Sequence, residues 1–221
     1  MCVLAYYAKA AGLQGPATDF AFRPSAPSGH FQRHLDSVLG TREVEHSYTL
    51  ACPGFDKHAM TRTTWSLPAL PLHECFQREL EQTPSVREKL RDSLQGQEWA
   101  SQYEQHPVVR GAAREEDVYP IAIYIDGVPF KKRDTLLAFY GYNLVSGNRN
   151  LVLVLRKSEL CHCGCLGWCT IYTAMEFLAW SVDALAQGQY PTSRHNKAAS
   201  SAGQRLMKAA LLFLNGDLGR A

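Results

Sequence analysis

The chain has 221 residues, of which 46% are hydrophobic, 20% are charged and 10% are aromatic. This ordinary globular composition excludes collagen-like, coiled-coil and wholly disordered proteins, and it leaves room for one domain of normal size or for a small domain with an accessory region. No stretch of the sequence reaches the roughly 18 consecutive apolar residues that a membrane-spanning helix requires.

Two features favour an intracellular, reducing location. Residues 1–11 have no basic leading region, and their short apolar stretch is interrupted by Lys9, which makes a poor secretory signal. Four of the seven cysteines fall within residues 161–169, unlike the even spacing of a disulfide scaffold.

The formal net charge of +2 is unevenly distributed. Residues 1–118 contain 12 Lys and Arg against 15 Asp and Glu, a net charge of −3, whereas residues 119–221 contain 11 against 6, a net charge of +5. A basic C-terminal half favours a polyanionic partner such as DNA. A solvated basic surface explains the same excess of positive charge equally well. The sequence pattern also changes here, so we predict a mainly helical and loop accessory region over residues 1–118 and a core over residues 119–221.

The accessory region shows weak signals of secondary structure. Apolar residues at helical spacing predict a helix over residues 31–39, and a short strand is expected over residues 43–51. Several prolines predict a loop over residues 52–71. Two charge-rich stretches predict helices over residues 73–82 and 85–95.

The core region has a sharper pattern. Runs of β-branched and aromatic residues predict three strands, joined by tight connections, and then a long amphipathic helix that ends at Gly188 and a fourth strand. These elements cover residues 119–125, 135–145, 151–155, 171–187 and 209–214. The first strand should end at Asp126-Gly127 and the fourth at the turn formed by residues 215–217.

This element order predicts an α+β or α/β fold with an incomplete ribonuclease H-like mixed sheet. Hairpins make the first three strands antiparallel, and the helical crossover places the fourth strand parallel to, and beside, the first. Asp126 and Asp217 would then converge at one edge of the sheet. Paired carboxylates there could hold magnesium or manganese for phosphodiester cleavage or strand transfer. Aspartates beside glycine are also common turn formers that need no metal.

Two other acids have simpler explanations. Asp134 stands just before the second strand and is expected to be a turn or edge residue. Glu176 lies on the helix, one position from its apolar stripe, and an exposed helical glutamate is the simpler interpretation.

The strongest local signal is the cysteine cluster, CHCGCLGWC. Its four cysteines lie within one short loop whose glycines allow a tight reversal, which predicts a structural zinc site formed by Cys161, Cys163, Cys165 and Cys169. Free thiols and redox-labile pairs are the alternatives, and His162 or His195 could replace one cysteine.

Basic residues follow the first and third strands, and they could contact a phosphate backbone: Lys131, Lys132, Arg133, Arg156 and Lys157. A solvated loop whose lysines protect a sheet edge is the alternative. The aromatic residues Tyr140, Tyr142, Trp168 and Trp180 are interpreted as packing residues and receive no functional role.

The run PIAIYIDG at residues 120–127, the cysteine cluster with its GWC triplet, and the closing Gly216-Asp217 are similar to segments of multi-copy proteins of unicellular eukaryotes. Those proteins resemble mobile-element transposases with a ribonuclease H-like core. The similar stretch runs from about residue 27 to Asp217. The resemblance to DDE transposases implies that Asp126 and Asp217 are the first two acids of the catalytic triad, that DNA is the substrate and that the location is nuclear.

Two departures accompany this resemblance. The third acid of such a triad lies on a helix beyond the fourth strand, whereas this sequence ends at Ala221; related sequences also carry Arg-His-Asp where this one has residues 194–196 as Arg-His-Asn. We therefore expect a truncated copy with weak or no activity. The alternatives are a non-catalytic, zinc-stabilised nucleic-acid-binding module and a decayed pseudogene product. An uncovered sheet face would favour self-association.

Overall fold

The computed structural model describes residues 48–94, 97–131, 134–193, 195 and 203–217. The chain divides into two units, residues 1–45 and residues 46–221, and all the described residues belong to the second. The helix expected over residues 31–39 and the start of the strand expected over residues 43–51 lie outside the described residues.

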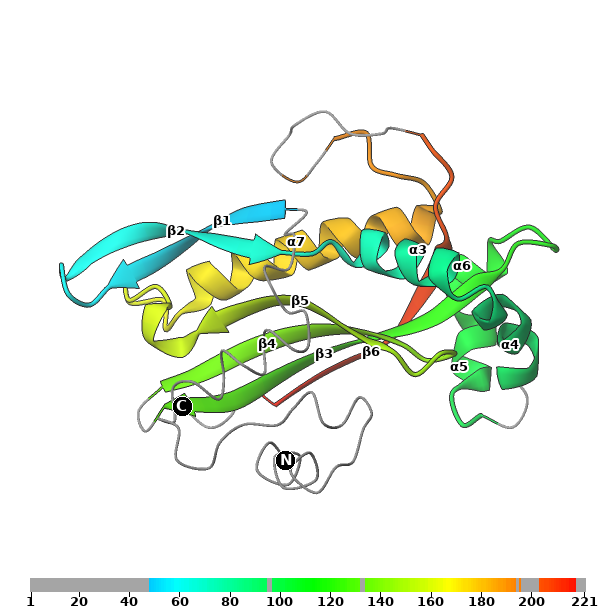
Figure 1. Cartoon of the computed structure of the whole chain (residues 1–221), viewed down its shortest axis with the longest axis horizontal. Helices are drawn as coiled ribbons and strands as arrows, with labels where there is room; N and C mark the ends of the chain where they lie inside the picture. The colour runs from blue at the N-terminus through cyan, green and yellow to red at the C-terminus, as the bar shows by residue number, and fades with distance from the viewer. Residues whose placement is uncertain (1–47, 95–96, 132–133, 194, 196–202, 218–221) are drawn as a thin grey trace, which may run out of the picture. The chain divides into compact units, whose positions relative to one another are not determined.

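A mixed four-stranded sheet forms the centre of the second unit (Figure 1). Its strands lie in the order β5-β4-β3-β6, in which β6 runs parallel to β3 and the other neighbours are antiparallel. This confirms the predicted strand order and the predicted parallel pairing of the first and fourth core strands. The four strands are β3 (Val118–Lys131), β4 (Asp134–Asn143), β5 (Arg149–Arg156) and β6 (Lys208–Asp217).

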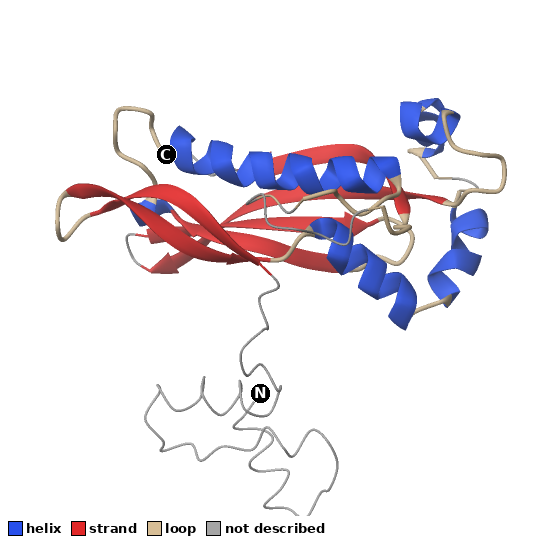
Figure 2. Ribbon diagram, turned by 90° about the horizontal axis from the view of Figure 1, so that it is seen from above, coloured by secondary structure: helices blue, strands red, loops and turns tan. Residues whose placement is uncertain are grey.

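Helix α7 (Trp168–Gln187) connects β5 to β6 and lies over one face of this sheet (Figure 2). Its buried side packs Phe177 and Leu178 into a core that also contains Ile121 and Phe139 from the central strands. The helix ends as predicted at Gly188, which adopts a left-handed conformation with φ of 69°. Burial of this continuous apolar face against the sheet holds the crossover in place.

A β-hairpin and four helices precede the sheet. Strands β1 (Tyr48–Asp56) and β2 (Thr61–Ala69) form a separate antiparallel pair, and β2 continues into a backbone hydrogen bond from Leu70 N–H to Val152 O of 2.8 Å. The helices are α3 (Leu72–Gln82), α4 (Ser85–Ser93), α5 (Ala100–Gln105) and α6 (Pro107–Arg110).

The loop predicted over residues 52–71 is therefore wrong, because most of that segment is the hairpin. Its prolines do not break the pairing: Pro53 lies opposite Thr64, and Pro68 lies opposite Thr49. Proline is tolerated in edge strands, and both strands of a two-stranded sheet are edges. The two helices predicted next, over residues 73–82 and 85–95, are confirmed as α3 and α4.

The two core strands with aspartates are longer than predicted. Strand β3 continues five residues beyond Asp126, and β6 includes Gly216 and Asp217. The expectation that Asp126-Gly127 and residues 215–217 form turns is wrong, because each of these residues still has a pairing partner. Asp126 lies opposite Ala138 on β4, and pairing between β3 and β4 runs on to Lys131.

Residues on both sides of the predicted boundary at residue 118 share one core. Tyr48 and Phe76, from the segment expected to be accessory, belong to the same buried cluster as Ile121 and Phe177. The described residues before Tyr119 are thus part of the same compact unit as the sheet. None of the helices in the described part of the chain is long and apolar enough to cross a membrane.

Candidate functional site

Asp126 and Asp217 occupy partner positions on neighbouring parallel strands. Their Cα atoms are paired in the register of β3 and β6, as are those of Ile125 and Gly216 before them. Asp126 is half-buried. The pairing predicted for the two candidate acids is confirmed at the level of the backbone, although Asp126 lies within its strand rather than at the end.

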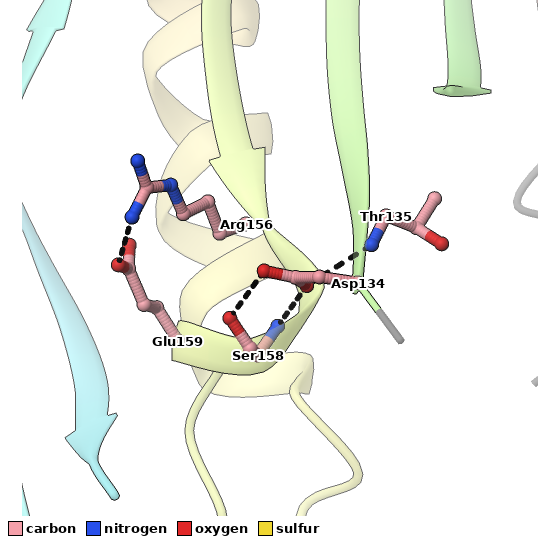
Figure 3. A network of polar contacts seen from close by, with 5 residues as sticks. All are labelled: Asp134, Thr135, Arg156, Ser158 and Glu159. Carbon is pink, nitrogen blue, oxygen red and sulfur yellow. Dashed lines mark hydrogen bonds and ion pairs between the residues drawn. The ribbon is translucent and has the colours of Figure 1, made fainter. Parts of the chain in front are cut away.

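Several functional candidates lie at the same end of the sheet. Because β5 runs antiparallel to β4, and β4 runs antiparallel to β3, the chain leaves β3, β5 and β6 at one end. Asp134 fixes this end. Its carboxylate accepts hydrogen bonds from the backbone N–H groups of Ser158 and Thr135, each at 3.0 Å, and from the Ser158 hydroxyl at 2.7 Å (Figure 3).

Asp134, expected just before the second strand, is instead the first residue of β4, an inner strand. Its hydrogen bonds join the start of β4 to the short 3-10 helix η2 (Lys157–Glu159), which leads into the cysteine cluster. Burial would raise the pKa of Asp134, but the hydrogen bonds from Ser158 and Thr135 outweigh it and lower the pKa. Glu176 is exposed on α7, as expected.

The predicted phosphate-binding residues separate into three groups. Lys131 is the last residue of β3, and residues 132–133 lie outside the described part of the chain. Arg156 donates to Glu159 across 3.1 Å in an exposed ion pair (Figure 3). Lys157, at the start of η2, is half-buried and forms no ion pair with any described residue.

The cysteine cluster forms a tight loop between η2 and α7. Three residues in the loop have left-handed backbones: Gly164, Leu166 and Gly167, with φ of 91°, 52° and 85°. A Cβ atom at Gly167 would also lie 2.9 Å from Leu160 Cδ1, so this position requires glycine for both reasons. The helix begins at Trp168, three residues before the predicted start, immediately after this reversal.

The loop brings all four cysteine sulfurs together. The Sγ atoms of Cys161, Cys163, Cys165 and Cys169 lie within 4.8 Å of one another, and those of Cys163 and Cys169 are 3.7 Å apart. The six cysteines among the described residues form no disulfide. The cluster is therefore positioned to bind a metal ion such as zinc.

The electrostatics of the loop favour a thiolate at Cys165. Its Sγ accepts a hydrogen bond from the Cys169 backbone N–H at 3.5 Å, at the start of α7, and this bond lowers the pKa of Cys165 to about 6. Hydrogen bonds with Cys165 and Cys163 raise the pKa of Cys169 to about 12. Burial raises the pKa of Cys161. A bound cation would favour ionisation of all four thiols.

Thr170 connects the cysteine loop to the β1–β2 hairpin. Its hydroxyl accepts a hydrogen bond from the backbone N–H of Cys161 at 2.9 Å and donates one to the carbonyl of Pro53. The sequence did not predict this contact, because no hairpin was expected at Pro53. Trp168, expected to be a packing residue, has a side chain that is 58% exposed.

The two histidines proposed as replacement ligands lie elsewhere. The His162 ring packs against Phe55, with ring centroids 5.2 Å apart. His195 packs against Phe177 and Trp180, midway along α7. Among the described residues, the candidate metal-binding group consists of the four cysteines alone.

Comparison of the chain with models of protein families, with curated proteins and with solved structures finds no match.

Proposed function

We propose that this chain has a ribonuclease H-like core, derived from a transposase-like protein, and that Asp126 and Asp217 support metal-dependent phosphodiester chemistry on DNA. The pairing of these two residues on adjacent parallel strands carries the proposal. The strand order β5-β4-β3-β6, with α7 as the crossover, supports it, because the ribonuclease H-like fold begins with this arrangement of elements.

The chemistry would follow from two carboxylates at one register position. Their oxygens are the hard ligands that magnesium and manganese prefer. Such ions activate a water or hydroxyl nucleophile and stabilise the leaving oxygen in phosphodiester cleavage. The resemblance matches Asp126 and Asp217 to two of the three acids of a DDE site.

The test measures metal binding and cleavage separately. Manganese binding is followed by electron paramagnetic resonance, and cleavage of labelled single-stranded and duplex DNA is followed with magnesium or manganese. We expect Asp126→Asn to weaken manganese binding and to reduce any cleavage at least tenfold. Asp183→Asn removes a carboxylate from an exposed position on α7 and serves as the control. Manganese binding that is unchanged in Asp126→Asn would overturn the proposal.

A second candidate function is a non-catalytic nucleic-acid-binding module stabilised by structural zinc, and the sulfur geometry favours it. A tetrahedral site with Zn–S bonds of about 2.3 Å has sulfur–sulfur edges of about 3.8 Å. The 3.7 Å separation of the Cys163 and Cys169 sulfurs matches such an edge. Four protein thiolates fill a tetrahedral zinc site, which is typical of structural rather than catalytic zinc.

Zinc content and DNA binding test this second candidate. One zinc per chain by mass spectrometry of the purified protein would support the centre, and a content near zero after zinc-replete expression would contradict it. DNA binding that weakens steeply with salt, persists in Asp126→Asn and Asp217→Asn, and leads to no cleavage would select the non-catalytic module.

A further inference from the structure

A cavity lies beside the cysteine loop at the end of the sheet where β5 ends. It has a volume of about 520 Å³, within the usual range for a ligand site. Its lining comes from four separate segments: Lys57 from the turn between β1 and β2, Asp134 from the start of β4, Lys157 and Ser158 from η2, and Gly167 from the cysteine loop. No pattern in the sequence brings these residues together.

Two lysines and one carboxylate line the cavity. Neither Lys57 nor Lys157 forms an ion pair with a described residue. Asp134 also lines the cavity, but its carboxylate already accepts hydrogen bonds from Ser158 and Thr135. The neighbouring acids are similarly occupied, since Asp56 accepts hydrogen bonds from the backbone N–H groups of His58 and Ala59, and Glu159 pairs with Arg156. The lining thus contains two lysines against one carboxylate, and the two lysines are placed to hold an anion.

Two exposed aromatic residues follow the cavity-lining cysteine loop in the chain, in the first turns of α7. Trp168 follows the cavity-lining Gly167 directly, and Tyr172 lies one helical turn further along α7. Their side chains are 58% and 51% exposed, and their ring centroids are 6.5 Å apart. Exposed aromatic rings beside unpaired lysines are typical of surfaces that stack the bases and hold the phosphates of single-stranded nucleic acid.

We propose that this cavity holds the phosphates of a single-stranded nucleic acid through Lys57 and Lys157, and that its bases stack on Trp168 and Tyr172. A duplex would bind less well, because its bases are stacked inside and offer no free face to the rings. The inference rests on the proposed nucleic-acid function and deepens it by naming the form of the substrate. The cavity lies at the end of the sheet where β3, β5 and β6 all end. Strand β3 runs from Asp126 towards this end, and Asp217 is the last residue of β6.

Fluorescence anisotropy tests the proposal without requiring catalysis. A labelled oligothymidylate and the matching duplex are titrated with the zinc-replete full chain, in buffer without magnesium or manganese. We expect the oligothymidylate to bind more tightly than the duplex. Substitution of both lysines, Lys57→Gln with Lys157→Gln, should make the slope of log K against log salt less negative by about 1.4, since each phosphate contact to a single strand contributes about −0.7.

Two further variants separate charge from stacking. Trp168→Ala should weaken binding at least fivefold while leaving the salt slope unchanged, and Trp168→Phe should restore most of the affinity. The control, Lys89→Gln with Arg114→Gln, removes two exposed cations outside the cavity and should change the slope less than the cavity pair does. Equal effects of the two double substitutions, or equal affinity for duplex and single strand, would overturn the inference. Absence of cleavage with binding intact would instead contradict only the catalytic proposal.

Discussion

The Sγ atoms of Cys163 and Cys169 lie 3.7 Å apart across the start of α7, and they join the exposed side of the cysteine loop to the first turn of the helix. A zinc ion bound by all four sulfurs would tie the loop to the first turn of the helix, and the free energy of zinc binding would then add to the stability of the folded state. We therefore expect the stability of this end of the protein to depend on zinc.

Cys169→Ser should abolish tight zinc binding, because a serine hydroxyl is a poor replacement for a thiolate ligand. The thermal midpoint of the zinc-replete variant should fall towards that of the wild-type protein stripped of metal. Cys75→Ala, which alters a buried cysteine outside the cluster, should keep its zinc. Zinc release measured with a chromogenic chelator checks the prediction, and full zinc retention by Cys169→Ser would contradict it.

Thr170→Val should loosen the contact between the cysteine loop and the hairpin. Valine has the shape of threonine but leaves the Cys161 N–H and the Pro53 carbonyl without their shared partner. A buried group that loses its hydrogen bond costs about 1–3 kcal/mol, so we expect urea unfolding to show a loss of about 2 kcal/mol. Thr170→Ser keeps the hydroxyl and should retain most of the stability. A loss in Thr170→Ser as large as that in Thr170→Val would contradict the prediction.

The core topology could be predicted because its residues carry two clear periodicities. Alternation of Ile121, Ile123 and Ile125 marked β3, and Gly188 marked the end of α7. The hairpin was missed because β2 is mostly exposed and shows little apolar alternation, and because Pro53 and Pro68 suggested loops. The β3 strand was predicted too short, because a local Asp-Gly signal carries no information about the partners on β4 and β6 that keep it extended.

The candidate site also has one part that the sequence could predict and one part that it could not. The four cysteines are close in sequence, so their spacing predicted the cluster that the structure shows. The positions of Lys57 and Pro53 depend on the hairpin, and they meet the cysteine loop only through long-range packing. A pattern within a short window cannot indicate such contacts. The exposure of Trp168 is likewise set by what the fold leaves uncovered.

Gly141→Ala should destabilise the packing of α3 on the sheet. A Cβ atom at this position on β4 would collide with Leu72 Cδ2 and lie 3.0 Å from Phe76 Cζ. Both side chains are fully buried, so neither can move aside cheaply. Overpacking of this kind costs about 1–3 kcal/mol. Gly216→Ala, whose new methyl group would meet no atom closer than 3.5 Å, is the control. Thermal unfolding should show a clear loss for the first variant and little for the second.

His73 should make the protein sensitive to mild acid. Its ring is buried against Ser181, with 2.8 Å between Nδ1 and Oγ, and burial lowers the pKa of His73 to about 4. The unfolded chain has the ordinary value of about 6.5, so between these pH values it binds a proton that the folded state does not bind. The contribution to stability is therefore complete above about pH 6.5 and is lost as the pH falls towards 4.

The loss in the free energy of unfolding follows from the difference between the folded and unfolded pKa values. Each unit of that difference is worth about 1.4 kcal/mol, which gives about 3 kcal/mol for His73 at pH 4. Urea unfolding at a series of pH values from 7 to 4 measures it. His73→Gln cannot titrate, so its stability should fall less steeply over this range. Burial also lowers the pKa of His195, which adds a dependence of the same sign that the variant retains. Parallel pH profiles for the wild-type protein and His73→Gln would show that the buried ring is not the acid-sensitive group.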